Sequence, residues 1–360
     1  MRIAVLWQSM SGYFSASLRA LAQLPGVDLC LAYRSPESHA PFDPTSFDWI
    51  DPQYSWADEP NTARLDALLA DFDPDAVLVS SWHINGYRAA LRHLGRQPTR
   101  VLCMDNQWLG TPRQWLGRLT WRQYIRPLFD VAFVPGDRQV TFANRLGFHN
   151  SRVLRGLYCA DTEAFTPRPG STDSRDYAFL FVGRLTELKG VSILIDAYQN
   201  YRNRAPRPWP LRIVGVGPLL SSMDGRNGIE CLGFVQPADL PKIMWAATSL
   251  VLPSRLEPWG VVVHEATIAG LIPICSERVG AAVHLVQDGY NGYVVPAENR
   301  TQLAAAMEMV ASKSETELSQ MRHASRQMSM QFSTDRWARY LVEMLTRVAH
   351  PRPQLDITAN

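Results

Sequence analysis

The sequence has few cysteines, and none stands in a pattern that would build a covalent or metal-bound scaffold. It has five cysteines among 360 residues, with no Cys-x-x-Cys pair and no cluster of histidines beside them. Disulfide frameworks and zinc sites both depend on such close spacing. We therefore expect neither, and we predict that the cysteines are buried free thiols.

Long apolar segments are missing as well. No window reaches the roughly 18 uncharged apolar residues that a membrane-spanning helix requires, and residues 1–14 lack the apolar stretch and cleavage site of a secretion signal. These absences predict a cytoplasmic protein. The net charge is only +2. Nucleic-acid-binding domains usually carry a marked basic excess, so we expect no nucleic-acid partner.

The charge is nevertheless distributed unevenly. Residues 28–75 contain eleven acidic residues against two arginines, whereas residues 88–126 contain eight arginines against one aspartate. A basic stretch within a nearly neutral chain indicates one localised anionic partner.

The apolar residues that are present form short runs at regular intervals. The first run, residues 2–7, precedes a Gly/Ser loop and then a helical pattern, and similar runs follow. Strand, loop and helix in this order open a Rossmann-like unit. The same rhythm restarts after residues 167–176, whose Pro, Gly, Ser and charge content is typical of an exposed linker.

These patterns predict an α/β protein with two Rossmann-like domains. We place an N-terminal domain at residues 1–168 and a second domain at residues 169–333. Both sheets should be parallel, because helical segments separate the strands. Residues 334–350 carry apolar side chains at helical spacing, which predicts a final helix packed on a core.

The densest chemical signal begins with two cations on one loop. Gly183 ends a predicted strand, and Arg184 and Lys189 follow it before the next helix. A diphosphate at the carboxyl edge of a parallel sheet requires such charges. The alternative is a solvated basic loop. Gly215 and Gly217 follow another strand and either let the backbone approach a ligand or form a simple tight turn.

Two glutamates flank a predicted helix start in the segment SRLEPWGVVVHEA. Glu257 lies in the loop, Gly260 stands where the helix begins, and Glu265 lies on its first turns. Free N–H groups at a helix start bind anions, and carboxylates accept hydrogen bonds from sugar hydroxyls. The alternative is a surface glutamate followed by one that only complements the helix dipole.

These segments together carry a family resemblance. GRLTELKG, GVGP, LGFV, PSRLEPWGVVVHEA, AGLIPI and DGYNGYVVPAEN resemble, in order and spacing, the donor half of the retaining GT-B glycosyltransferases of family four. The resemblance is close over residues 180–300. It implies two Rossmann-like domains that face each other across a cleft, with the C-terminal helix crossing back to the N-terminal domain.

The resemblance also implies roles for individual residues. Arg184 and Lys189 would hold the diphosphate of a nucleoside diphosphate sugar and stabilise it as the leaving group. Glu257 would hold the donor sugar, and Glu265 the ribose. The remaining donor-binding residues that it implies are Gly12, Gly183, Gly215, Gly217, Phe234, Val235, Pro258, Trp259, Gly260 and Val261. Phe234 and Val235 would pass the nucleobase. No cofactor or metal is expected, because this family generally works without one.

The acceptor side is less clearly marked. His83 and Asp105 stand at predicted strand ends of the first half. His83 would bind a sugar hydroxyl or orient the acceptor, or else it packs in the core. Asp105 would accept a hydrogen bond from the acceptor hydroxyl, or else it caps a helix or turn.

The segment PRQWLGRLTWRQYIRPLF combines arginines with aromatic residues. Arg118, Arg122 and Arg126 follow at steps of four, with Trp115 and Trp121 beside them. Such a helix can lie on an anionic membrane surface, or its positive charges can meet an acceptor on a lipid diphosphate. The alternative is a core-packed helix whose arginines face solvent.

The sequence thus predicts a retaining glycosyltransferase. It would move a hexosyl-type unit from a nucleoside diphosphate sugar, such as a UDP or GDP sugar, to a hydroxyl of a cell-surface glycan or lipid-linked precursor, as in polysaccharide biosynthesis. Its place would be the cytoplasm, with attachment to the inner face of the plasma membrane. The alternatives are a nucleotide-sugar epimerase or hydrolase, and a non-catalytic sugar-nucleotide-binding protein.

Overall fold

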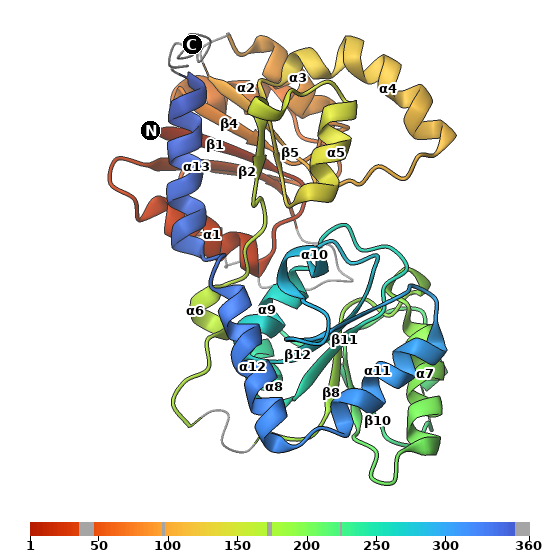
Figure 1. The fold of residues 1–360 in the computed structure, drawn as a ribbon. Coiled ribbons are helices and arrows are strands. Elements are labelled where there is room, and N and C mark those ends of the chain that lie inside the picture. The colour runs from red at the N-terminus through yellow and green to blue at the C-terminus, as the bar shows by residue number, and fades with distance from the viewer. Residues whose placement is uncertain (36–46, 96–97, 171–174, 224, 350–360) are drawn as a thin grey trace, which may run out of the picture. The chain divides into compact units, whose positions relative to one another are not determined.

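The computed structural model describes residues 1–35, 47–95, 98–170, 175–223 and 225–349, and the chain divides into two compact units. The first unit comprises Met1–Tyr158 with Thr334–Asn360, and the second comprises Cys159–Ser333. Both are α/β, with a parallel sheet and helices on its faces (Figure 1). No helix among the described residues is long and apolar enough to cross a membrane.

The chain passes between the units earlier than the predicted boundary at residues 168 and 169. Phe165 is buried in the second unit, where its carbonyl accepts a hydrogen bond from Trp245 Nε1 at 2.9 Å. The helix α6 (Thr162–Phe165) also packs on α9 (Val261–Ala269). The Pro- and Gly-rich segment 167–176 is therefore not the crossing point, and its residues 171–174 lie outside the described part.

The first unit contains a seven-stranded sheet in the order β3-β2-β1-β4-β5-β6-β7. Apart from the edge strand β3, whose side chains are mostly exposed or half-buried, its short strands are apolar and largely buried, as expected for a sheet covered on both faces. The strands are β1 (Arg2–Trp7), β2 (Asp28–Arg34), β3 (Gln53–Trp56), β4 (Ala76–Val79), β5 (Thr99–Cys103), β6 (Val131–Val134) and β7 (Val153–Arg155). The helices are α1 (Gly12–Ala22), α2 (Thr62–Phe72), α3 (Asn85–His93), α4 (Pro112–Tyr124), α5 (Asp137–Arg145) and α13 (Thr334–Ala349).

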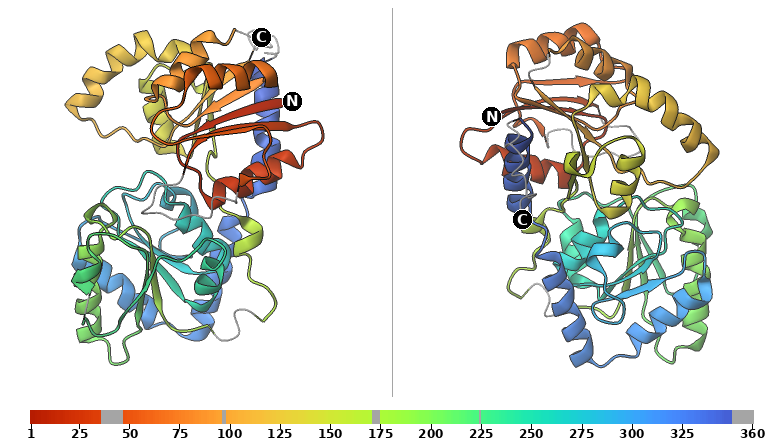
Figure 2. Two further views of the ribbon diagram at one scale, coloured as in Figure 1. Left: turned by 180° about the vertical axis from the view of Figure 1, so that it is seen from behind. Right: turned by 45° about the horizontal axis from the view of Figure 1, so that its top comes forward.

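The last helix, α13, belongs to the first unit, where it packs against α1 (Figure 2). Trp337 is its main anchor: the ring lies 6.3 Å from Phe14 and 6.2 Å from Phe133 between centroids, and Nε1 donates to the Leu157 carbonyl at 3.0 Å. The prediction of a final helix packed on a core is confirmed. Residue 350, its predicted end, lies outside the described residues.

The second unit contains a six-stranded parallel sheet in the order β10-β9-β8-β11-β12-β13. Its strands are β8 (Phe179–Val182), β9 (Leu211–Val214), β10 (Ile229–Gly233), β11 (Ser249–Leu252), β12 (Ile272–Ser276) and β13 (Tyr293–Val295). The further helices are α7 (Val191–Arg204), α8 (Leu240–Ala246), α10 (Ala282–Leu285), α11 (Arg300–Ala311) and α12 (Glu315–Ser329). Figure 1 shows α7 beside α11, and α12 beside α9, in agreement with their packing.

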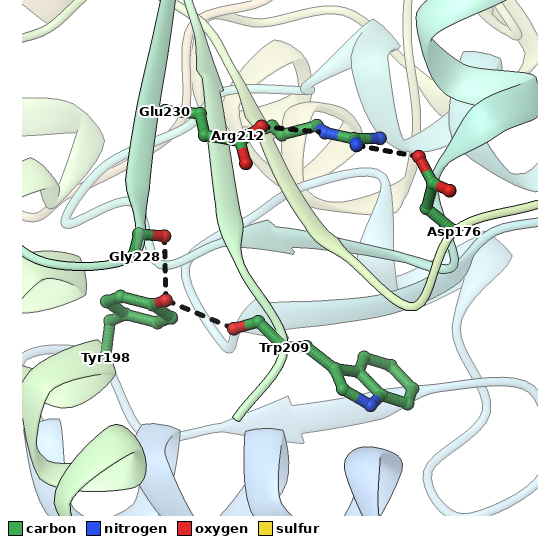
Figure 3. Close-up of polar contacts among 6 residues, drawn as sticks. All are labelled: Asp176, Tyr198, Trp209, Arg212, Gly228 and Glu230. Carbon is green, nitrogen blue, oxygen red and sulfur yellow. Dashed lines mark hydrogen bonds and ion pairs between the residues drawn. The ribbon is translucent and has the colours of Figure 1, made fainter. Parts of the chain in front are cut away.

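Polar side chains join the beginnings of β8, β9 and β10 (Figure 3). Arg212 pairs with Asp176 at 2.7 Å and with Glu230 on the neighbouring strand at 3.1 Å. The Tyr198 hydroxyl lies 2.8 Å from the carbonyl oxygen of Gly228. These contacts satisfy a partly buried guanidinium with two carboxylates and fix this edge of the sheet.

The cysteines are free, and one of them differs from the prediction. Cys30, Cys103, Cys159 and Cys275 are buried, whereas Cys231 is exposed. Cys231 lies on β10, which is an edge strand and carries mostly exposed side chains. A run that reads as apolar in the sequence can therefore face solvent when its strand has a neighbour on one side only.

Candidate functional site

The second sheet has a topological switch point between β8 and β11. The strand order runs outward from β8 to β10 on one side and from β11 to β13 on the other. In open α/β sheets, ligands bind beyond the carboxyl ends of the strands where the order reverses. The loops that follow β8 and β11, residues 183–190 and 253–260, therefore define the candidate functional site.

An ion pair joins these two loops. Lys189 ends a short 3-10 helix, and its Nζ donates a hydrogen bond to Oε2 of Glu257. Only 22% of the Lys189 side chain and 9% of the Glu257 side chain are exposed. Because desolvation offsets much of the attraction in a buried pair, stability alone gives little reason for it. The pair is the electrostatic centre of the candidate site.

Backbone contacts hold the same two loops together. The Arg255 N–H donates to the Leu188 carbonyl at 2.9 Å. A Cβ on Gly190 would lie 2.1 Å from the Pro253 carbonyl oxygen, and its φ of +71° also favours glycine. Gly190 is thus required for the site, and the sequence analysis missed it although it directly follows Lys189.

Arg184 lies on the first of these loops but takes no part in the ion pair. Its side chain is exposed, and no acceptor within the described part of the chain holds its guanidinium. Its carbonyl accepts a hydrogen bond from the Thr186 N–H at 2.9 Å, which closes the turn. The structure therefore brings Lys189 and Glu257 together and leaves Arg184 as a second, solvated cation.

The two glycines after β9 have a packing role. A Cβ on Gly215 would lie 1.9 Å from the Gly183 carbonyl oxygen, and one on Gly217 would lie 2.5 Å from the Leu185 carbonyl oxygen. The backbone at both glycines thus lies against the backbone of the loop after β8. The glycines thus position a neighbouring loop of the site, and their contact with a ligand stays a prediction.

The helix α9 begins beside Glu257. Gly260 is its N-cap with φ +91°, and the Val263 N–H makes the first hydrogen bond back to the Gly260 carbonyl at 3.0 Å. Val261 and the next residue therefore keep N–H groups at a positive helix end. Trp259 is buried, with its ring 5.6 Å from His284 between centroids. The Pro258 carbonyl packs closely against Gly280, since a Cβ on Gly280 would lie only 2.0 Å from the carbonyl oxygen.

Glu265 lies one turn further along α9, and its pKa is perturbed. Burial and the nearby Asp161 carboxylate raise the pKa of Glu265 to about 7. Asp161 caps α6, accepting a hydrogen bond from the Ala164 N–H at 3.0 Å. Asp161 is not among the residues predicted from the sequence, although an aspartate directly before a short helical stretch is a recognisable N-cap.

His264, like Gly190 and Asp161, is not among the residues predicted from the sequence. It is buried, and its Nδ1 accepts a hydrogen bond from the Ala160 N–H at 3.0 Å. Its ring packs edge-on against Phe332 at 5.6 Å. Burial lowers the pKa of His264 to about 4, so the imidazole is neutral at physiological pH. Its role is to hold two backbone segments against α9.

Phe234 and Val235 follow the edge strand β10. Both are half-buried, and the turn that comes next is closed by hydrogen bonds from Asp239 and Leu240 to the Gln236 carbonyl at 3.0 and 3.2 Å. This segment lies after the carboxyl end of a strand, at the same edge of the sheet as the loops described above.

In the first unit, Gly12 and His83 lie beside the corresponding switch point, between β1 and β4. Gly12 is the first residue of α1, whose first turn contains no acidic residue. The His83 side chain is exposed after β4, so the alternative of a core-packed histidine is wrong. Gln8 ties the two loops, because its N–H donates to Ser80 Oγ at 2.8 Å.

Asp105 follows β5 and is half-buried. The Tyr158 hydroxyl donates to its Oδ2 at 3.3 Å, and Gln139 Nε2 donates to its carbonyl at 3.2 Å. The next helix is capped by Thr111, so the alternative of a helix-capping Asp105 is wrong. Burial and the Asp105 charge raise the pKa of Tyr158, which keeps this hydroxyl a donor.

Two of the residues predicted to face a membrane or acceptor have a structural role instead. Trp121 is buried, and its Nε1 donates to the Leu146 carbonyl at 3.1 Å. Arg126 donates to the Gly147 carbonyl at 3.2 Å and stacks on Phe148 at 4.1 Å. Both residues come after the exposed turns of α4, where the chain returns to the core of the first unit.

Trp115, Arg118 and Arg122 remain on the surface side of α4. Trp115 is 48% exposed, and the Arg118 guanidinium lies 5.0 Å from its ring centroid. Arg122 is exposed, and Arg118 is half-buried. The large apolar side chains that are exposed on or next to this helix are Leu109, Trp115, Leu116, Leu119 and Tyr124. Together with Arg113, Arg118 and Arg122 they form what we call the α4 surface.

Over the described ranges, no group of three or more His, Cys, Asp or Glu side chains is placed to hold a metal ion.

Two Rossmann-like units, with the last helix returning to the first, define the GT-B fold. The solved structure of HepE from Anabaena, in complex with UDP and glucose, is similar over 96% of this chain and 99% of that chain, with a TM-score of 0.75 and 16% identity. At this identity the similarity shows the fold alone.

Residues 164–328 match the family described as Glycosyl transferases group 1. The matched residues make up most of the second unit. The D-inositol 3-phosphate glycosyltransferase of Jonesia denitrificans is 31% identical over 185 residues, which are 47% of this chain and 43% of that protein. The putative colanic acid biosynthesis glycosyltransferase WcaL of Escherichia coli is 23% identical over 67% of this chain and 60% of that protein. The chain thus spans less than two thirds of these relatives.

Proposed function

We propose that this protein transfers a sugar from a nucleoside diphosphate sugar to a hydroxyl group of an acceptor, with retention of the anomeric configuration. The observation that carries the proposal is the largely buried Lys189–Glu257 pair at the switch point of a unit that matches the group 1 glycosyl transferases, beside the start of α9. A cation, a carboxylate and free helix N–H groups meet the needs of a sugar diphosphate.

In this proposal Lys189 and Glu257 contact different parts of the bound donor. Lys189, with the solvated Arg184, offsets the charge of the diphosphate and stabilises it as it leaves. Glu257 accepts hydrogen bonds from hydroxyls of the donor sugar. The sugar carbon is attacked on the face that the diphosphate leaves, and the departing phosphate assists the acceptor hydroxyl. The chain supplies positioning and charge stabilisation.

The nucleoside lies along α9 and β10 in the same proposal. The N–H groups at Gly260 and Val261 bind phosphate oxygens, and Glu265 accepts from the ribose hydroxyls. Phe234 and Val235 flank the base. The HepE complex with UDP and glucose supports a UDP sugar as the first donor to test, and GDP sugars are the second.

For the first unit we propose that residues in the loops after β1, β4 and β5 contact the substrates. Gly12 lies close to the donor phosphates, because it has no side chain at the start of α1 and the first turn of that helix carries no acidic residue to repel them. Asp105 accepts from the acceptor hydroxyl, and exposed His83 orients a sugar. The acceptor class we propose is a cell-surface glycan or its lipid-linked precursor, which the relative named for colanic acid biosynthesis supports.

We further propose that the α4 surface attaches the protein to the cytoplasmic face of an anionic membrane. Leu116 and Leu119 are 72% and 64% exposed, and Arg122 adds positive charge beside them. Exposed apolar side chains with arginines fit the boundary between lipid headgroups and acyl chains. An acceptor carried on lipid would be reached from that position.

Removal of the Lys189 amine tests the central role. Lys189→Ala should lower sugar transfer by about 100-fold or more, as removal of a group that stabilises a leaving charge does. Release of nucleoside diphosphate is measured with UDP and GDP sugars in the presence of glycan and lipid-linked acceptors. Lys242→Ala is the control, because that lysine is 75% exposed on the same unit.

The fate of the sugar separates the alternatives. Conversion of the donor without acceptor would indicate an epimerase or hydrolase, and binding without turnover in every donor and acceptor combination would indicate a binding protein. Near-normal transfer by Lys189→Ala would remove the assigned mechanism.

A further inference from the structure

A second cluster of charged side chains lies at the end of the second sheet where its strands begin, away from the candidate functional site. A cavity of about 420 Å³ is lined by Arg175, Tyr177, Glu315, Ser319, Arg322 and Arg326, among others. The first two precede β8, and the others lie on α12. The cavity therefore opens where the parallel strands begin, whereas the candidate functional site lies where they end. We call it the basic cavity.

The contacts of the three arginines leave most of their donors unused. Arg175 donates to the carbonyls of Ala269 and Gly270, both at 2.9 Å, at the end of α9. Arg322 donates to Glu315. A guanidinium has five N–H donors, so Arg175 keeps three of them. The Arg326 side chain has no hydrogen-bond partner among the residues that the structure describes.

Among the described residues that line the cavity, Glu315 is the one carboxylate. Glu315 accepts from Arg322 and also, through its other oxygen, from the Tyr177 hydroxyl at 3.0 Å. Arg212 on the same unit shows the contrast, because two carboxylates satisfy that single guanidinium (Figure 3). Among the described residues that line the basic cavity, three arginines stand against one glutamate, so this lining carries an excess of positive charge.

The arginines disfavour one another's charge. Burial, together with Arg322 and Arg326, lowers the pKa of Arg175 to about 10. Burial and Arg322 also lower the pKa of Arg326. An anion that entered between them would relieve this repulsion.

We propose that the basic cavity binds a small phosphorylated anion, at a site separate from the donor site. Planar guanidinium groups match pairs of phosphate oxygens, which is why arginines gather where phosphate is bound. The Ser319 hydroxyl is a further donor, and the volume suits a diphosphate or sugar phosphate. The same chemistry occurs on a lipid headgroup, but the recessed position favours a free anion. This inference does not depend on the proposed transfer reaction.

Titration calorimetry with inorganic pyrophosphate tests the proposal on the full chain. The Lys189→Ala protein serves as the background, because its donor site has lost its buried cation. In that background, Arg326→Gln should weaken pyrophosphate binding at least tenfold. Arg300→Gln changes the net charge equally at a side chain that is 65% exposed on α11, and it should leave binding unchanged.

Arg322→Gln provides a second variant with the same expected loss if Arg326→Gln does not fold, as judged by circular dichroism. Absence of pyrophosphate binding in the background protein, or equal dissociation constants in the arginine and control variants, would overturn the proposal. Sedimentation with phosphatidylglycerol vesicles distinguishes the lipid source. A loss of vesicle binding in Arg326→Gln, without any pyrophosphate binding, would also contradict a free-anion site.

Discussion

At the scale of single residues, charge and burial act together on α9. Gly260, His264 and Glu265 lie within six positions, and their environments differ sharply. The first leaves helix N–H groups free, the second is buried and neutral, and the third has a pKa raised to about 7. A carboxyl group with such a pKa changes its charge in the physiological range, so any ligand that needs its ionised form will bind in a pH-dependent way.

The affinity for UDP should therefore depend on pH through Glu265, given its proposed contact with ribose. Because the hydroxyls need an acceptor, binding should favour the carboxylate and lower its pKa in the complex. Affinity for UDP should fall by up to tenfold per pH unit below about 7. Glu265→Gln should bind UDP more weakly and with a flatter pH profile.

Calorimetry from pH 5.5 to 8 on both proteins measures this difference. Protonation of the nucleotide itself affects both titrations equally and cancels in the comparison. Parallel pH profiles for the two proteins would refute the assignment of Glu265.

At the scale of elements, α4 divides into two parts with different surroundings. Its last turn enters the core through Trp121, whose ring also packs on Trp82 at 4.9 Å. The preceding turns expose Leu116 and Leu119. An amphipathic sequence pattern identifies such a helix but does not decide which aromatic residue faces inward, because that depends on the hole available in the neighbouring core.

The exposed part of α4 should be replaceable without loss of stability. Leu116→Ser combined with Leu119→Ser should reduce binding to phosphatidylglycerol vesicles by about tenfold or more, because apolar area no longer enters the lipid. Thermal unfolding should be nearly unchanged, since both side chains are largely exposed.

Met330→Ser is the matched control for vesicle sedimentation, because this side chain is 74% exposed on the second unit. Wild-type protein that binds neutral and anionic vesicles equally, or binds neither, would exclude the α4 surface as a membrane contact.

At the scale of the whole molecule, α9 is connected to both segments that lead out of the second unit. His264 accepts from Ala160, close to the crossing at residues 158 and 159, and packs on Phe332, close to the crossing at residues 333 and 334. The neighbouring Glu265 interacts with Asp161. Two titratable groups with opposite shifts thus lie where the chain enters and leaves this unit.

Their effects on stability should oppose each other. The folded pKa of His264 is about 4, below its unfolded value of 6.5, so its contribution is lost as the pH falls from about 6.5 to 4. The folded pKa of Glu265 is about 7, above its unfolded value of 4.5, so its contribution is lost as the pH rises from about 4.5 to 7. Between about 4.5 and 6.5 the two slopes should largely cancel.

Single variants should therefore expose one slope each. In Glu265→Gln, stability should fall with acidification between pH 6.5 and 4, by on the order of 2 kcal/mol. In His264→Asn, which keeps an acceptor for the Ala160 N–H, stability should instead fall as the pH rises from 4.5 to 7. Urea unfolding at several pH values measures both, and identical pH profiles for the two variants would contradict the shifts.

The order of residues was enough to predict the two Rossmann-like units, the final helix and the segments that carry Lys189, Glu257 and Glu265. Buried parallel strands and strand-end loops leave local patterns, in which apolar runs, glycines and charges follow in a set order. Only the tertiary structure decided that Trp121 and Arg126 serve the core, that the chain crosses at residues 158 and 159, and that Arg175 meets Arg322 and Arg326. These features depend on burial and on contacts between distant segments, and neither has a local signal in the order of residues.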